Sequence, residues 1–134
     1  WEKSFKAPIK ESLLGLAEVS PSLSSPIMEM LKFVGLRTFA RSTSADQRLI
    51  LISDMVEHND SYSQYRNRDL DFEKLAQTRY FREMRPRLSD VMIDILYVER
   101  PALIEIQGGD HITKFWQPLV RQSGGQIRDV TYIN

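Results

Sequence analysis

Asp54 is the residue of this sequence whose type and position most clearly suggest chemistry. It follows the aliphatic run Leu49–Ile52 and one serine, so its carboxylate lies where a buried strand would end. In open α/β sheets, ligands bind beyond the carboxyl ends of the strands. A carboxylate there is desolvated unless a cation or hydrogen-bond donors meet it, and a divalent cation such as Mg²⁺, Mn²⁺ or Ca²⁺ is a suitable partner. The alternative is that Asp54 only caps the next turn.

Asp54 also has an enzymatic interpretation, as the reacting or metal-bound carboxylate of a hydrolase or phosphotransferase. That chemistry requires a second acid, a nearby lysine and a group that holds phosphate. Lys74 and Lys114 lie in predicted helices with no motif around them, and the sequence contains neither a P-loop nor a Gly-x-Ser-x-Gly motif. The sequence therefore favours a protein that is not an enzyme, with the enzyme kept as the alternative.

The two histidines and a tyrosine-containing segment are the other candidates. A zinc site needs three or four suitably spaced ligands, and the chain has no cysteine, so His58 and His111 are expected on the surface. The polar segment 60–66 carries Tyr62 and Tyr65, and tyrosine is enriched among the residues that dominate protein interfaces. We therefore take His58, Tyr62 and Tyr65 as candidate partner contacts. The alternative is an exposed irregular loop.

Length and composition restrict the class of protein. The chain has 134 residues, enough for one domain with a core, and its 18 basic and 18 acidic residues balance. No basic excess suggests a nucleic-acid partner, and no apolar run is long enough to insert into a membrane. Because the sequence opens on Trp1, we expect a piece of a longer protein, with room upstream for a membrane anchor. The cellular location cannot be predicted.

The spacing of apolar residues predicts two leading helices followed by alternating strands and helices. Helices are expected over 4–19, 27–40, 72–85 and 110–123, and strands over 48–53, 91–98 and 127–133. Ser25 is expected to cap the second helix, with Pro26 as its first residue and Met30 on its inward face. The continuous run Leu49–Ile52 predicts a strand buried on both faces.

This order of elements predicts an α/β fold. Strands joined through helices require right-handed crossovers and a mainly parallel sheet, as in a Rossmann-like three-layer α/β/α architecture. Three strands make a small sheet, and the two leading helices have no strand before them. We therefore expect residues 1–134 to form a single domain that is part of a larger one, with one or more strands upstream of Trp1.

Two stretches resemble von Willebrand factor A-type domains. LILISDM is similar to the strand of that family that ends in an aspartate of its metal-ion-dependent adhesion site, and SSPIMEML, residues 24–31, is similar to the second loop of that site. The resemblance implies that Ser25 and Asp54 are metal ligands and that Ser24 lies beside them. HITKFW, followed by Gly-Gly and a last strand, is similar to a group of bacterial members of the family.

The sequence departs from the family pattern at two points. It contains no Asp-x-Ser-x-Ser stretch, the first loop of the family's metal site, and Met55 follows Asp54 where the family commonly has glycine. We expect the first loop to lie before Trp1. A hydroxyl and one carboxylate make a poor site by themselves, so Mg²⁺ binding by this chain is expected to be weak or absent.

The resemblance implies a function for the chain. It predicts a non-enzymatic module in which a divalent cation, held in part by Ser25 and Asp54, accepts an acidic group from a protein partner. One alternative is the metal-dependent hydrolase or phosphotransferase that uses Asp54. Another is a degenerate domain that serves only as an assembly surface.

Overall fold

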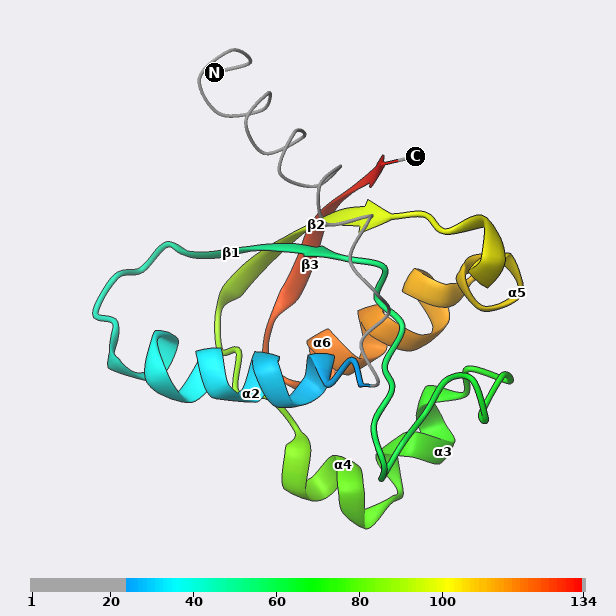
Figure 1. Cartoon of the computed structure of the whole chain (residues 1–134). Helices are drawn as coiled ribbons and strands as arrows, with labels where there is room; N and C mark the ends of the chain where they lie inside the picture. Colours follow the sequence, from blue (N-terminus) through cyan, green and yellow to red (C-terminus); the bar gives the residue numbers. More distant parts are fainter. Residues whose placement is uncertain (1–23, 134) are drawn as a thin grey trace.

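The computed structural model describes residues 24–133 (Figure 1). Residues 1–23 and 134 lie outside the described part, and so does the helix predicted over 4–19. The described chain combines helices with one sheet, as expected for a mixed α/β fold.

The sheet has three parallel strands in the order β1-β2-β3. They are β1 (Gln47–Ser53), β2 (Val91–Val98) and β3 (Gln126–Ile133), within one residue of the predicted bounds. Leu49 of β1 pairs with Ile93 of β2, and the β2–β3 register shifts between Ile93 and Asp94. The carboxyl ends of all three strands therefore lie at the same edge of the sheet.

Short helices connect these strands. The helical elements before β2 are α2 (Ile27–Arg37), the 3₁₀ turn η2 (Phe39–Arg41), α3 (Phe72–Ala76) and α4 (Arg79–Met84). The single helix predicted over 72–85 is wrong, since Thr78 adopts an extended conformation and caps α4 through its side-chain oxygen, which accepts the N–H of Phe81 at 3.1 Å. A capping threonine ends one helix and begins the next because it satisfies a free N–H group.

Between β2 and β3 the chain departs further from prediction. The elements there are η3 (Pro101–Leu103), α5 (Ile104–Gln107), the π-helix η4 (His111–Trp116) and α6 (Gln117–Gln122). The turn and helix over 101–107 were not predicted. Pro118 lies in the first turn of α6, directly after the π-helix, and proline is tolerated best in the first turn of a helix.

Helix α2 differs from prediction in its cap and in its buried face. Pro26 occupies the capping position with no side-chain bond, and Ser25 lies one residue outside. The N–H of Met28 is instead accepted by the carboxylate of Glu57 at 2.9 Å. Ile27 and Leu31 are buried as predicted, but Met28 is buried in place of Met30, which is exposed, so the buried face is only partly the predicted one.

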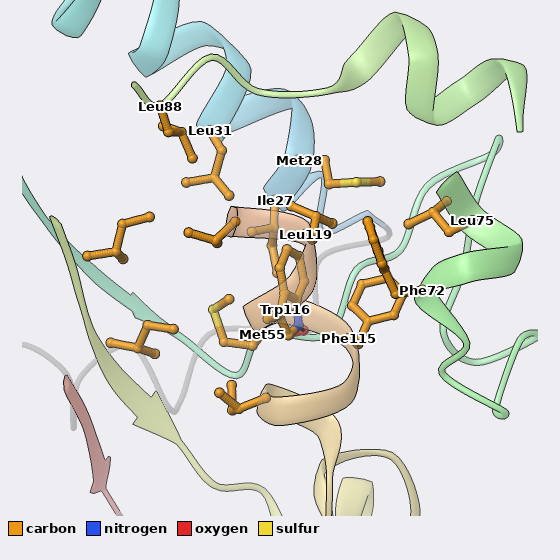
Figure 2. Close-up of a cluster of buried hydrophobic side chains, with 14 of the residues drawn as sticks. Ile27, Met28, Leu31, Met55, Phe72, Leu75, Leu88, Phe115, Trp116 and Leu119 are labelled. Atoms are coloured by element: carbon orange, nitrogen blue, oxygen red, sulfur yellow. Dashed lines mark hydrogen bonds between the residues drawn. The ribbon is translucent and has the colours of Figure 1, made fainter. Parts of the chain in front are cut away.

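The core lies between the sheet and the helices on one of its faces (Figures 1 and 2). Phe115 and Trp116 of η4 occupy its centre and are fully buried. Phe115 meets the ring of Phe72 edge-on, with centroids 6.5 Å apart, and stacks on Tyr62 at 5.9 Å. These aromatic contacts join α3, η4 and the loop after β1 into one packed unit.

The opposite face of the sheet has no helix over it in the described part of the chain. Burial alternates along β1, so that Ile50 and Ile52 are 44% and 38% exposed, and the prediction of a strand buried on both faces is wrong. Asp94 also lies on this face, where Arg128 donates to its carboxylate at 2.8 and 2.9 Å and Arg48 donates to it as well. We call this surface the open face.

Candidate functional site

Asp54 lies just beyond the carboxyl end of β1, as predicted, and its carboxylate already has partners. Oδ1 accepts the N–H of Val56 at 3.1 Å, and Oδ2 forms an ion pair with Nε of Arg100 at 3.0 Å. Arg100 follows β2, so the ion pair joins the ends of two neighbouring strands. The bond to Val56 is the turn cap weighed as the alternative role. The Asp54 side chain is 13% exposed, which leaves it within reach of a group at the edge.

Gln107 holds the two strand ends together beneath this ion pair. Its side-chain nitrogen donates to the carbonyl oxygens of Asp54 and Val98 at 3.0 and 2.9 Å, and its oxygen accepts the N–H of Arg100 at 2.8 Å. The side-chain amide thus forms hydrogen bonds with three backbone groups of the two strand ends. Asp54 and Arg100 are therefore placed by a buried support and not only by their own attraction.

Met55 has a backbone conformation that is unusual for its residue type. Its φ is 57°, in the left-handed region, and its side chain is buried in the core. This conformation is unfavourable for residues with a Cβ atom and is readily adopted by glycine. The N–H of Met55 donates to the hydroxyl of Ser53 at 2.9 Å, and the turn directs the chain away from the strand immediately after Asp54.

Ser25 meets the loop after Asp54 through its backbone. Its N–H donates to the carbonyl of His58 at 2.6 Å, and its carbonyl accepts the N–H of His58 at 3.0 Å. The start of α2 and the loop that follows β1 are therefore adjacent. Ser24 is exposed and Ser25 is half-buried.

Glu57 is a buried residue that sequence reasoning missed. Besides the N–H of Met28, its carboxylate accepts the side-chain amide of Asn59 at 2.9 Å and the hydroxyl of Tyr80 at 3.2 Å. Burial raises its pKa to about 7, against the opposing effect of the hydrogen bonds from Met28 and Tyr80. Glu57 caps α2 from another segment of the chain, so the carboxylate stabilises the positive end of the helix.

His111 is buried, and its prediction as a surface histidine is wrong. Its Nε2 lies 3.1 Å from the side-chain oxygen of Gln64 and 3.3 Å from Nε1 of Trp116, and its Nδ1 lies 2.7 Å from the hydroxyl oxygen of Tyr97. Burial lowers the pKa of His111 to about 4, which keeps the ring neutral. The histidine was misassigned because its partners lie on segments distant in sequence.

The remaining candidate partner contacts divide between core and surface. Tyr62 is buried, stacking on Phe115 and Tyr80, and therefore belongs to the core. Tyr65 is 43% exposed and meets the ring of His58 edge-on at 5.2 Å. His58 is half-buried, and its Nδ1 lies 2.8 Å from the hydroxyl of Ser63. His58 and Tyr65 therefore form one surface cluster on the loop that contacts Ser25.

The two residues predicted as metal ligands, Ser25 and Asp54, lie on neighbouring segments, because Ser25 pairs through its backbone with His58 in the loop that follows Asp54. Within residues 24–133, no three histidine or acidic side chains lie close enough together to hold a metal ion. Mg²⁺ and Ca²⁺ take six or more oxygen ligands, so most ligands of any cation here would come from water or from a partner. Arg100 is already paired with Asp54 and would compete with such a cation.

None of the helices described here is long and apolar enough to cross a membrane. Comparison of the chain with models of protein families, with curated proteins and with solved structures found no match.

Proposed function

We propose that this chain is a non-enzymatic protein-binding module resembling a von Willebrand factor A domain of Rossmann-like topology. In this proposal the partner binds at the carboxyl edge of the sheet, where Ser25 and Asp54 supply two oxygen ligands to a divalent cation. An acidic side chain of the partner completes the coordination, as oxygen ligands suit Mg²⁺ and Mn²⁺.

The position of Asp54 carries the proposal. Its carboxylate lies beyond the end of a parallel strand, where α/β sheets bind their ligands. Of its two oxygens, Oδ1 accepts the N–H of Val56, and the partner of Oδ2 described above is the guanidinium of Arg100. The backbone bridge between Ser25 and His58 adds a second oxygen-bearing side chain on an adjacent loop. Both residues predicted as metal ligands thus belong to segments that meet.

The conformation of Met55 supports the resemblance to the family. Its φ of 57° is one that glycine adopts easily, and glycine is the residue common at this point in von Willebrand factor A-type domains. Met55 therefore differs from the family in residue type but has the backbone conformation that a glycine would favour. A residue held in this region is also the kind of strain that accumulates at binding sites.

Arg100 gives the proposed site a resting state. While no cation is bound, its guanidinium neutralises Asp54 at 3.0 Å. A cation has to displace this group, and the side chain of Arg100 is 53% exposed, so it can turn into solvent. After this displacement the guanidinium of Arg100 would still lie near the edge of the sheet, and its positive charge would attract the acidic side chain of the partner.

Titration of the full chain with Mn²⁺, followed by amide signals in NMR spectra, tests this proposal. Paramagnetic broadening is expected first at Ser25 and Asp54, with a dissociation constant on the order of 10⁻³ M, as for weak oxygen sites. Asp54→Asn should abolish the broadening. Arg100→Gln should tighten binding by about two- to fivefold, because it removes a competing ion pair that is partly exposed to solvent.

Arg68→Gln is the matched control. Arg68 forms an exposed ion pair with Glu105, and its removal changes net charge by the same amount as Arg100→Gln. The proposal requires Arg68→Gln to leave Mn²⁺ binding unchanged. Two results would show that the cation binds elsewhere and would overturn the assignment. One is paramagnetic broadening that is unchanged in both Asp54→Asn and Ser25→Ala. The other is Mn²⁺ binding that tightens equally in Arg100→Gln and Arg68→Gln.

The alternative of a hydrolase or phosphotransferase has no specific observation in its favour. The described partners of the Asp54 carboxylate are an amide and a guanidinium, and neither is a lysine that could hold a phosphoryl group. Hydrolysis of a phosphoester by the full chain, lost in Asp54→Asn, would establish the enzyme in place of the binding module.

A further inference from the structure

Helix α2 carries a row of apolar side chains on the side that faces away from the core. Met30, Phe33 and Leu36 are 57%, 54% and 41% exposed, whereas Ile27 and Leu31 of the same helix point into the core (Figure 2). We call the three exposed residues the outer stripe. They follow one another at intervals of three residues, which places them along one ridge of the helix. Apolar residues scattered singly on a surface are ordinary, but a contiguous row marks a surface that binds another molecule.

Basic residues border the outer stripe at the carboxyl end of α2. Cζ of Arg37 lies 5.4 Å from the centroid of the Phe33 ring, and Arg41 follows in η2. Both arginines are exposed, and neither forms an ion pair within residues 24–133. Methionine, aromatic residues and arginine are the types enriched in protein interfaces. The outer stripe and its border therefore have the composition of such an interface.

A second group of arginines lies on the segment that packs beside α2. Nζ of Lys32 donates to the carbonyl oxygen of Glu83 at 2.6 Å, and a Cβ atom at Gly35 would collide with the carbonyl oxygen of Arg87. Three arginines of this segment are exposed and have no carboxylate partner in the described part of the chain: Arg82, Arg85 and Arg87. Unpaired positive charge therefore gathers around α2, although the basic and acidic residues of the whole chain balance at 18 each.

We propose that the outer stripe and these arginines form a docking surface for an acidic amphipathic helix of a protein partner. The apolar side of such a helix would pack on the outer stripe, and its carboxylates would pair with the arginines. Charge selects this occupant, because carboxylates form strong two-point hydrogen bonds with guanidinium groups that still lack an acidic partner. The inference goes beyond the proposed metal site and does not depend on a cation at Asp54.

Other occupants fit this surface less well. In a two-fold dimer the same patch meets itself, so a second copy would bring arginines against arginines. Helices that lie on membranes bury one broad apolar side, but the broad apolar side of α2 is already packed in the core. An acidic helix is the occupant that suits both the narrow apolar row and the charge beside it.

Binding of a designed peptide to the full chain tests the proposal. The probe is a helical peptide of about 20 residues, long enough to form a helix in water, with leucines along one side and glutamates beside them. The control peptide has lysine in place of each glutamate. Calorimetry should show that the acidic peptide binds at least about tenfold more tightly than the basic one, because charge complementarity excludes the wrong partner. A rise in salt from about 0.05 M to about 0.5 M should weaken its binding, since salt screens exposed charges.

Variants of the chain locate the binding surface. Phe33→Ala should weaken binding of the acidic peptide at least about tenfold, as loss of a central aromatic contact does in interfaces. Arg37→Gln should weaken it about two- to fivefold, because an ion pair there is partly exposed to solvent. The matched controls are Ile104→Ala, at a position 64% exposed on α5, and Arg121→Gln, at an exposed position on α6. Both should leave the affinity unchanged, and circular dichroism establishes that each variant is folded.

Several results would overturn the proposal. They are no binding of the acidic peptide at about 1 mM, the limit of weak association, equal affinity for the two peptides, or an affinity that neither Phe33→Ala nor Arg37→Gln changes. A dimer seen in sedimentation and lost in Phe33→Ala would also overturn it and would assign the surface to a second copy. Binding to vesicles of phosphatidylcholine and phosphatidylserine that is lost in Phe33→Ala would assign it instead to a membrane.

Discussion

The two faces of this sheet hold their carboxylates in opposite ways. On the helical side Glu57 is buried among neutral donors, and its pKa is raised to about 7. On the open face Asp94 has two arginines, and its pKa is lowered. A carboxylate without a cation tolerates burial only where backbone and side-chain donors meet it and at the expense of a shifted pKa. The helical side is therefore a closed interior, whereas the open face holds its carboxylate between two arginines whose side chains are about half exposed.

The largest expected effect is the loss of stability when a core side chain on the helical side is truncated. Phe115→Ala is expected to lower the free energy of unfolding by about 3–5 kcal/mol, because it removes a fully buried ring and leaves a cavity between α3 and η4. Urea denaturation followed by the fluorescence of the tryptophans measures the change. A loss below about 1 kcal/mol, the usual effect of a surface substitution, would show that the helical layer is loosely packed.

The next effect concerns pH on the helical side. The folded-state pKa of Glu57, about 7, exceeds its ordinary value of 4.5, so its contribution to stability is complete below pH 4.5 and is lost as pH rises to about 7. The folded-state pKa of His111, about 4, lies below its ordinary 6.5, so stability from this residue rises between pH 4 and 6.5. Between pH 4.5 and 6.5 the two contributions oppose each other.

Single variants should separate these contributions. Relative to the native chain, Glu57→Gln should gain stability between pH 4.5 and 7, and His111→Gln should lose its rise between pH 4 and 6.5. Each difference should reach about 3 kcal/mol, because a tenfold change in proton affinity on folding corresponds to about 1.4 kcal/mol. Urea denaturation at each pH, compared with the native chain, provides the difference. Parallel curves for the native chain and both variants would mean that neither group titrates differently on folding.

The smallest effect distinguishes the open face from ordinary surface. Ile52→Ala should lower the free energy of unfolding by about 1–2 kcal/mol, because Ile52 is only 38% exposed and each buried methylene group contributes about 0.8 kcal/mol. Phe33→Ala, a more exposed position on α2, should change it by less than about 0.5 kcal/mol. The same urea denaturation measures both. Equal losses of unfolding free energy in Ile52→Ala and Phe33→Ala would show that the open face does not differ from ordinary exposed surface.

The sequence predicted the strands better than the helices, for a physical reason. Runs such as LILI and VMIDILYV contain β-branched and aromatic residues, which favour strands, and both are strands at the predicted places. The helices depend on capping and on contacts with distant segments. Thr78 divides one predicted helix, and Glu57 caps α2 from 29 residues away, which no local pattern indicates.

The candidate site was predictable in position but not in its contacts. A carboxylate at the end of a strand run indicated Asp54, and the strand end is where it lies. Its partner Arg100 and the support from Gln107 come from the next crossover, and only the parallel pairing of β1 with β2 brings them together. The burial of β1 was misjudged because a run of aliphatic residues does not reveal which of its two faces a layer covers.

The place of β1 at the border of the sheet has a consequence for how the purified chain behaves. Among the described strands β1 pairs only with β2, so the N–H and C=O groups on its other side are not paired with a described strand. Its seven residues include neither proline nor lysine. Edge strands lacking these protective residues tend to recruit strands from other molecules. The chain should therefore self-associate as its concentration rises, and a lysine in place of Leu51, within this strand, should raise its solubility limit at some loss of stability.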